Sequence, residues 1–154
     1  PEGMPAMREA EGKQISIDLL RRAAKMSELI ESIASRRDII LRQYEERLRR
    51  RIVSLFEKAS SVPDQDRLLE EVAIYADKVD FTEEIVRFRS HVVQLKGFLE
   101  EHDAVGRKLD FLIQEMNRET NTIGSKAQDL AVTEAVLQLK NEIEKIREQV
   151  QNIE

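Results

Sequence analysis

The stretch GRKLDFLIQEMNRETNTIGSK, residues 106–126, decides the fold class of this chain. Its apolar side chains recur every three or four residues, a spacing that gathers them on one side of an α-helix. The residues on this stripe are Leu109, Leu112, Ile113, Met116, Thr120 and Ile123. We therefore expect an amphipathic helix whose stripe packs against other helices.

The remaining sides of this predicted helix are polar in an unusual way. Lys108, Glu115, Glu119 and Lys126 form a charged flank, and next to it lies a sector of Arg107, Asp110, Gln114, Asn117, Arg118, Asn121 and Ser125. A merely solvated side would favour Glu, Lys or Ala over Asn, which is a modest helix former. The sector is therefore a polar network packed against a neighbour, a surface for phosphates and base edges, or a solvated side. The pattern alone favours the packed network.

The composition agrees with a helical protein. Only 5 of the 154 residues are Gly and 3 are Pro, and neither strand-like alternation nor internal repeats are visible. Cys is absent, which excludes disulfides and thiolate metal sites. No apolar run approaches the roughly 18 residues of a membrane span. The net charge of −5 argues against a uniformly basic nucleic-acid binder, but it permits a local basic surface.

Gly and Pro divide the chain into predicted segments. Residues 1–13 are expected to be a linker from a preceding domain, and residues 14–154 a helical domain. Predicted helices cover residues 16–59 (with or without a break), 65–79, 82–102, 106–126 and the final segment. We expect Pro63 to end the first helix, Asp64 to cap the second and Asp80 or Thr82 to cap the third. Gly124 is expected to interrupt or bend the chain.

The two ends of the helical region predict an elongated fold. A helix over residues 16–59 would be about 65 Å long and would need a partner helix or another subunit along it. The final segment places Val132, Val136, Leu139, Ile143, Ile146, Val150 and Ile153 at alternating four- and three-residue steps, a heptad seam. The predicted fold is all-α, an elongated helical bundle with one very long N-terminal helix and a coiled-coil-like C-terminal helix.

His91 is the main candidate for chemistry, because the only other His, His102, is expected in a solvent-facing turn. Glu84 lies seven residues before His91 on the same side of the predicted third helix. Two turns separate them, so another helix must contribute before both can hold one ion. A lone helical His is more often a surface or packing residue. The alternative is that His91, with Glu84 or Glu115, binds a divalent metal or acts as an acid or base.

Arginines are concentrated in residues 36–51, RRDIILRQYEERLRRR. Such a run is usually a solvated or subunit-contacting side of a helix, and a phosphate-contacting role is the alternative. Aromatic residues are few, so a base-stacking platform is not expected. They are Tyr44, Phe56, Tyr75, Phe81, Phe88, Phe98 and Phe111. No glycine-rich phosphate loop, H-E-x-x-H motif or nucleophile elbow is present, which excludes a classical metalloprotease, kinase or serine hydrolase.

Several stretches together resemble one known family. The stretch at 106–126 and EIEKIREQVQNIE at 142–154 closely resemble the C-terminal domain of the YicC/YloC-like family. MREAEG at 7–12 and RLLEEVAIYADKVDFTEEIVRFRSH at 67–91 are also similar to it. Members are bacterial, cytoplasmic proteins about twice this length, long called stress-induced proteins. They are described as metal-dependent endoribonucleases that assemble as hexamers around a channel for RNA.

The resemblance implies a C-terminal helical half that acts on RNA, with Mg²⁺ or Mn²⁺ as cofactor, in a cytoplasmic homo-oligomer. It implies no membrane and no DNA partner. Candidate RNA-binding residues are Arg107, Lys108, Asp110, Asn117, Arg118, Asn121 and Lys126. Candidate catalytic residues are His91, Glu84, Glu115 and Glu119, and residue type assigns the metal to His91, Glu84 and Glu115. The alternative function is a non-catalytic oligomerisation module with a buried polar network between subunits.

Overall fold

The residues that the structure describes are almost entirely helical. The computed structural model describes the backbone of residues 3–58, 65–100 and 106–153, and no strand occurs in these ranges. Its helices are α1 (Gly3–Lys58), α2 (Gln65–Val79), α3 (Thr82–Glu100), α4 (Gly106–Ala127) and α5 (Leu130–Ile153). The all-α prediction is confirmed. The predicted stop at Pro63, the cap at Asp64 and the turn with His102 lie outside the described residues.

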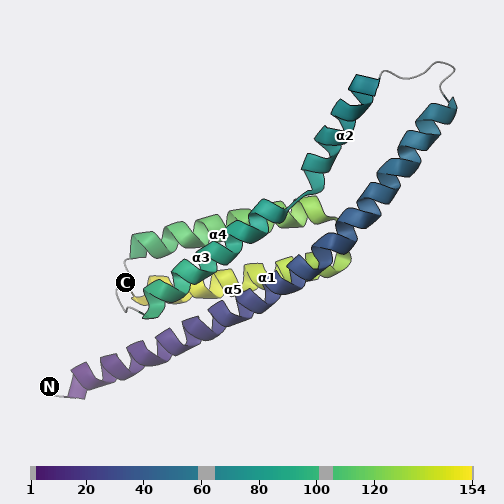
Figure 1. Ribbon diagram of the computed structural model, residues 1–154. Coiled ribbons are helices and arrows are strands. Elements are labelled where there is room, and N and C mark those ends of the chain that lie inside the picture. The colour runs from purple at the N-terminus through teal and green to yellow at the C-terminus, as the bar shows by residue number, and fades with distance from the viewer. Residues whose placement is uncertain (1–2, 59–64, 101–105, 154) are drawn as a thin grey trace.

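Helices α1, α3, α4 and α5 pack into an elongated bundle (Figure 1). Helix α1 packs against α3 and α5, and α4 packs against the same two helices from the other side. The predicted stripe of α4 is fully buried at Leu109, Leu112, Ile113, Met116, Thr120 and Ile123. The predicted seam of α5 is buried from Val132 to Val150, and it faces both α1 and α4, as in a helical bundle. Periodicity therefore identified the core-facing side of both helices.

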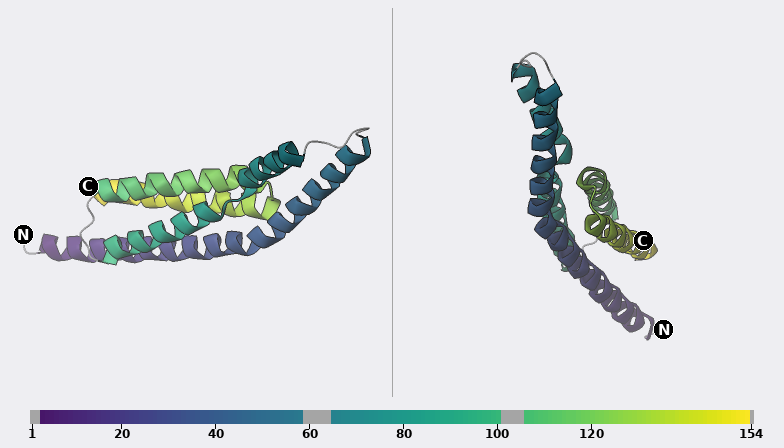
Figure 2. Two further views of the ribbon diagram at one scale, coloured as in Figure 1. Left: turned by 45° about the horizontal axis from the view of Figure 1, so that its top comes forward. Right: turned by 90° about the vertical axis from the view of Figure 1, so that its right-hand side faces the viewer.

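Helix α1 is longer than predicted and has no break. Its 56 residues correspond to about 84 Å at 1.5 Å per residue. The helix includes residues 3–13, which were expected to be a linker, because Pro5 lies in the first turn, where no backbone N–H is needed. The C-terminal end of α1 and helix α2 project together beyond α4 and α5 (Figure 2). The stacked rings of Tyr44 and Tyr75, with centroids 4.5 Å apart, connect these two projecting helices.

The starts of α3 and α5 are capped by aspartates. The Thr82 N–H donates to Asp80 Oδ1 at 3.0 Å, so Asp80 is the cap, and α3 ends at Glu100. The predicted interruption at Gly124 is wrong, because α4 continues to Ala127 and the chain turns at Gln128, whose φ is 45°. Asp129 then accepts the Val132 N–H at 3.1 Å. A Cβ at Gly124 would lie 3.3 Å from Val136 Cγ1, so this glycine permits close packing of α4 on α5.

Ion pairs fasten α1 to its two neighbours. The Arg36 guanidinium makes a two-pronged contact with Asp129, with Nη2 2.6 Å from Oδ1, and Arg22 pairs with Glu142 on α5. Toward α3, Arg89 binds both carboxylate oxygens of Glu31. Within the arginine-rich run, Arg36 and Arg37 therefore have partners in the bundle. The later arginines at 42, 47 and 49–51 are exposed, and their contact with phosphate stays a prediction.

Candidate functional site

The antiparallel seam between α3 and α4 carries polar groups in consecutive layers. Glu84, His91 and Phe98 are seven residues apart, so they lie along one side of α3. On α4, Lys126 faces Glu84, Glu119 faces His91 and Lys108 lies over the ring of Phe98. Residue numbers rise along α3 and fall along α4 through these three pairs, so the two helices run antiparallel. The central layer holds the candidate site.

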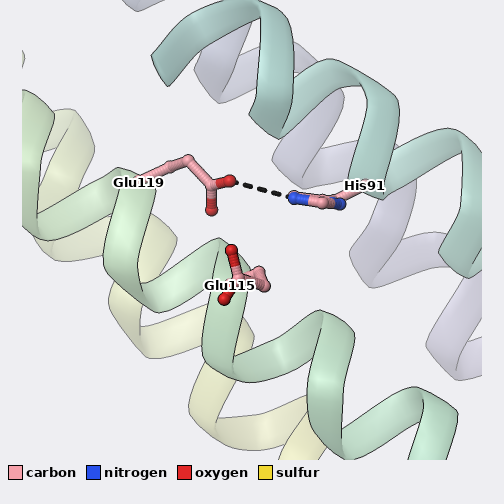
Figure 3. A group of neighbouring side chains, drawn as sticks. All are labelled: His91, Glu115 and Glu119. Carbon is pink, nitrogen blue, oxygen red and sulfur yellow. Dashed lines mark ion pairs between the residues drawn. The ribbon is translucent and has the colours of Figure 1, made fainter. Parts of the chain in front are cut away.

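In that layer, His91 and two glutamates converge on one point. His91 Nε2 lies 2.9 Å from Glu119 Oε1, and Glu115, one turn before Glu119, turns its carboxylate toward the same space (Figure 3). One ligand atom from each of the three residues lies within 4.8 Å of the other two. The Glu119 side chain is 3% exposed and that of His91 is 16% exposed. The three groups are thus close enough to bind one small cation.

The buried atoms of this cluster have unmet hydrogen-bonding capacity. His91 Nδ1 and both carboxylate oxygens of Glu119 are buried without a hydrogen-bond partner in the described residues. The short His91–Glu119 distance therefore does not correspond to a well-directed hydrogen bond. Leaving a buried polar group unsatisfied costs about 1–3 kcal/mol, and more for a charged group. A ligand that binds these atoms would remove that cost.

The electrostatics of the cluster point the same way. Burial raises the pKa of Glu119, the nearby His91 opposes this effect, and the second carboxylate at Glu115 adds to it. A carboxylate in such a place either takes a proton or is neutralised by a cation. Two ionised glutamates outnumber the single His91, so this cluster has an excess of negative charge when both carboxylates are ionised. A divalent cation would remove this excess.

The donor set fits a divalent transition metal. One imidazole nitrogen and two carboxylates suit Mn²⁺ better than Mg²⁺, which prefers oxygen ligands and water. Of the predicted set of His91, Glu84 and Glu115, the structure does not bring Glu84 to the cluster, because Glu84 pairs with Lys126 at 3.1 Å. Glu84 is two turns, about 10 Å, from His91 along α3. Glu119 lies beside His91 and Glu115 instead, and the four-residue spacing of Glu115 and Glu119 was a sequence signal that they share one side of α4.

The predicted RNA-binding residues are split between the surface and the packed seam. Arg107, Lys108, Arg118 and Asn121 are exposed, and Asp110 and Asn117 are half-buried. Lys126 differs, because its ammonium donates to the Asp80 carbonyl at 3.2 Å and to Glu84. Most of the amide and arginine sector faces solvent, since Gln114 and Ser125 are exposed as well. Packing within the described chain therefore does not bury this sector.

Comparison with known proteins identifies the class of protein that this fold and site belong to. Residues 33–154 match the family described as Endoribonuclease YicC-like, C-terminal. Because the match covers most of the chain, this chain belongs to that family. The resemblance noted from the sequence is thereby confirmed.

Two relatives extend this finding over nearly the whole chain. A protein of Clostridioides difficile strain 630, named probable endoribonuclease YicC, is 51% identical over 148 residues. A protein of Haemophilus influenzae strain Rd with the same name is 36% identical over 149 residues. These alignments include 96% and 97% of this chain and 50% of each relative. The chain therefore spans about half the length of the curated relatives that it matches.

The helices were also compared with the requirements of a membrane span. Among the described residues, none of the helices combines the length and the apolar character needed to cross a bilayer. This agrees with the sequence, which has no long apolar run.

Proposed function

We propose that this chain is the C-terminal part of a metal-dependent endoribonuclease and that His91, Glu115 and Glu119 are its metal ligands. The observation that carries the proposal is the buried cluster itself. It brings one ligand atom from each of three side chains on two helices within 4.8 Å of one another, and buried atoms of His91 and Glu119 have no hydrogen-bond partner among the described residues. The relatives that share this region are named probable endoribonucleases.

The residues of the seam have distinct proposed roles. A bound divalent ion would supply Lewis acidity and an activated water for phosphodiester hydrolysis. Glu119 and His91 hold the centre of the site, and Glu115, being more accessible than Glu119, is suited to accept a proton there. Arg118, exposed next to Glu119, and Arg107 neutralise phosphate charge. Asn117 and Asn121 fix the ribose or the bases by hydrogen bonds.

The proposal extends to the assembly and the location of the whole protein. The long α1 and the exposed polar sector of α4 support a homo-oligomer, for which a hexameric ring is our expectation. In such a ring the sector would face the RNA. We place the protein in the cytoplasm, where its RNA substrates would be found.

The proposal is tested by RNA cleavage with the full-length protein. Labelled RNA should be cleaved with Mn²⁺, left intact with EDTA and cleaved again when Mn²⁺ is restored in excess. His91→Ala, Glu115→Gln and Arg118→Ala should each lower the cleavage rate, whereas Glu134→Gln, which alters an exposed carboxylate on α5, should not. Unchanged cleavage by the first three variants would contradict the assignment.

A non-catalytic oligomerisation module is the second candidate, and one observation favours it. Leu130 and Leu137 are 75% and 62% exposed and lie seven residues apart on one side of α5. Another subunit would cover such a pair. This function predicts that Asn117→Ala and Asn121→Ala break the assembly in light scattering. Intact oligomers that lose only RNA binding would argue against it.

A further inference from the structure

A groove lies at one end of the α3–α4 seam. It encloses about 250 Å³ and is lined by Gln94, Phe98, Arg107, Lys108, Phe111 and Leu112. The floor is apolar, since Leu112 is buried and Phe98 is half-buried. The rim is cationic, since Arg107 and Lys108 are both exposed. The groove thus combines aromatic surface with positive charge.

The aromatic surface of this groove is available to a ligand. The Phe111 side chain is 60% exposed, which is unusual for such a large apolar ring in a helix that also has a fully buried stripe. The Lys108 ammonium lies 5.6 Å from the centroid of the Phe98 ring, a cation–π distance. This contact holds a positive charge directly beside the Phe98 ring.

The groove adjoins the His91, Glu115 and Glu119 cluster. Gln94 lies one helical turn after His91 on α3, and Phe111 lies one turn before Glu115 on α4. One turn is about 5.4 Å along the helix axis. Since α3 and α4 run antiparallel, both steps lead in the same direction along the seam. An RNA strand bound at the cluster would therefore place its next nucleotide in the groove.

We infer that this groove binds one unpaired base of the RNA, adjacent to the phosphate held at the cluster. The base stacks on Phe111, the amide of Gln94 meets its edge, and Arg107 and Lys108 contact the neighbouring phosphates. Bases of single-stranded RNA can be splayed onto aromatic rings in this way, whereas a duplex keeps them stacked inside. The small volume admits one base. The inference rests on the proposed function, and it differs from the expectation that the chain has no base-stacking platform.

The test is an abasic scan of a single-stranded RNA oligonucleotide with the full-length protein. Each RNA has one nucleotide without its base, and binding is measured with Mn²⁺ present, over a time too short for cleavage. At one position, loss of the base should weaken binding to the wild-type protein by about 5- to 100-fold. Phe111→Ala should weaken binding of the intact RNA by a similar factor and should bind the abasic RNA no worse than the intact one. Phe111→Tyr, which keeps the ring, should retain the wild-type pattern.

Controls separate this inference from the proposed function. Ile74→Ala removes an apolar side chain of comparable exposure from α2 and should leave the scan unchanged. RNA binding with no position sensitive to base loss, or equal effects of Phe111→Ala and Ile74→Ala, would overturn the stacking inference alone. A change of assembly mass in light scattering of Phe111→Ala would also overturn it, because Phe111 would then be a subunit contact. Failure of the wild-type protein to bind RNA would overturn both.

Discussion

Two seams of the bundle use charged residues for different purposes. Between α1 and α5, each buried or half-buried carboxylate faces an arginine, as in the pairs Arg22–Glu142 and Arg36–Asp129. In the central layer between α3 and α4, two glutamates face one His, and neither glutamate has an ion pair with Lys or Arg among the described residues, unlike Glu84 with Lys126 in the same seam. The first arrangement is electrically complete and the second is not. Buried carboxylates without a compensating positive charge destabilise the fold. Such an arrangement is therefore more typical of a binding site than of a structural contact.

The difference predicts opposite effects for one substitution made in each seam. On the proposed function, Glu119→Gln should lower metal-dependent cleavage on the order of 100-fold or more, because the proposed metal site loses one ligand. It should leave the melting temperature unchanged or higher. Burial raises the pKa of Glu119, so the stability linked to this group is present at low pH and falls as pH rises through the folded pKa. At pH 7, a neutral Gln avoids the cost of burying an ionised carboxylate.

The matched change in the other seam is Glu142→Gln, and thermal melting with and without Mn²⁺ separates the two. Glu142→Gln should lower the melting temperature, because Arg22 loses its 3.0 Å partner, and should keep the cleavage rate. Mn²⁺ should raise the melting temperature of the wild-type protein and of Glu142→Gln, but not of Glu119→Gln. An equal Mn²⁺ effect in all three proteins would remove Glu119 from the metal site.

The space around two helical glycines gives a second contrast, because Gly124 is tightly packed and Gly97 is not. Gly124→Leu should cost about 1–3 kcal/mol, because a Cβ there already lies 3.3 Å from Val136. Gly97 has nothing within 4 Å of a Cβ, so Gly97→Ala should stabilise the protein by about 0.5–1 kcal/mol through helix propensity. Chemical denaturation measures both. A stabilising Gly124→Leu would show that α4 and α5 are loosely packed.

The sequence predicted best what depends on one helix alone. The period of the apolar residues indicates the buried side of α4, and Leu112 and Met116, which that period assigns to the core, are both buried. The prediction failed where the register between helices decides. The sequence indicated Glu84 or Glu115 as the partner of His91, and only the offset of α3 against α4 places Glu119 at 2.9 Å from His91 and Glu84 beside Lys126. Periodicity contains no information on that offset.

Local residue preferences failed for a related reason. Gly124 has poor helix propensity, which favoured a break, but a close contact with Val136 on another helix requires the missing Cβ. The groove was missed because Phe98 and Phe111 are far apart in sequence and meet only through the antiparallel pairing of α3 and α4. Both predictions required knowledge of which residues of different helices lie next to each other, and the sequence pattern does not give this.

The cap of α5 gives a smaller effect that depends on pH. Arg36 and the Val132 N–H hold the pKa of Asp129 below its usual value. A lowered pKa contributes stability above the unfolded value of about 3.9 and loses it as pH falls through the folded pKa. Asp129→Asn should therefore cost roughly 1 kcal/mol at pH 7, a few degrees of melting temperature. The difference in free energy of unfolding between the wild-type protein and Asp129→Asn should be constant above about pH 5 and should disappear below about pH 4.

The smallest effect is expected at the exposed pair of α1 and α3. Arg89 and Glu31 have a complete two-pronged contact, at 2.6 and 2.9 Å, yet their side chains are 45% and 59% exposed. Water and salt screen such a pair, so a double-mutant cycle with Arg89→Ala and Glu31→Ala should give about 0.2–1 kcal/mol at low salt. The coupling should shrink at 1 M salt, where the Debye length is roughly 3 Å. A salt-independent coupling energy above about 1 kcal/mol would mean that two-pronged geometry, rather than burial, sets the strength of the ion pairs in this bundle.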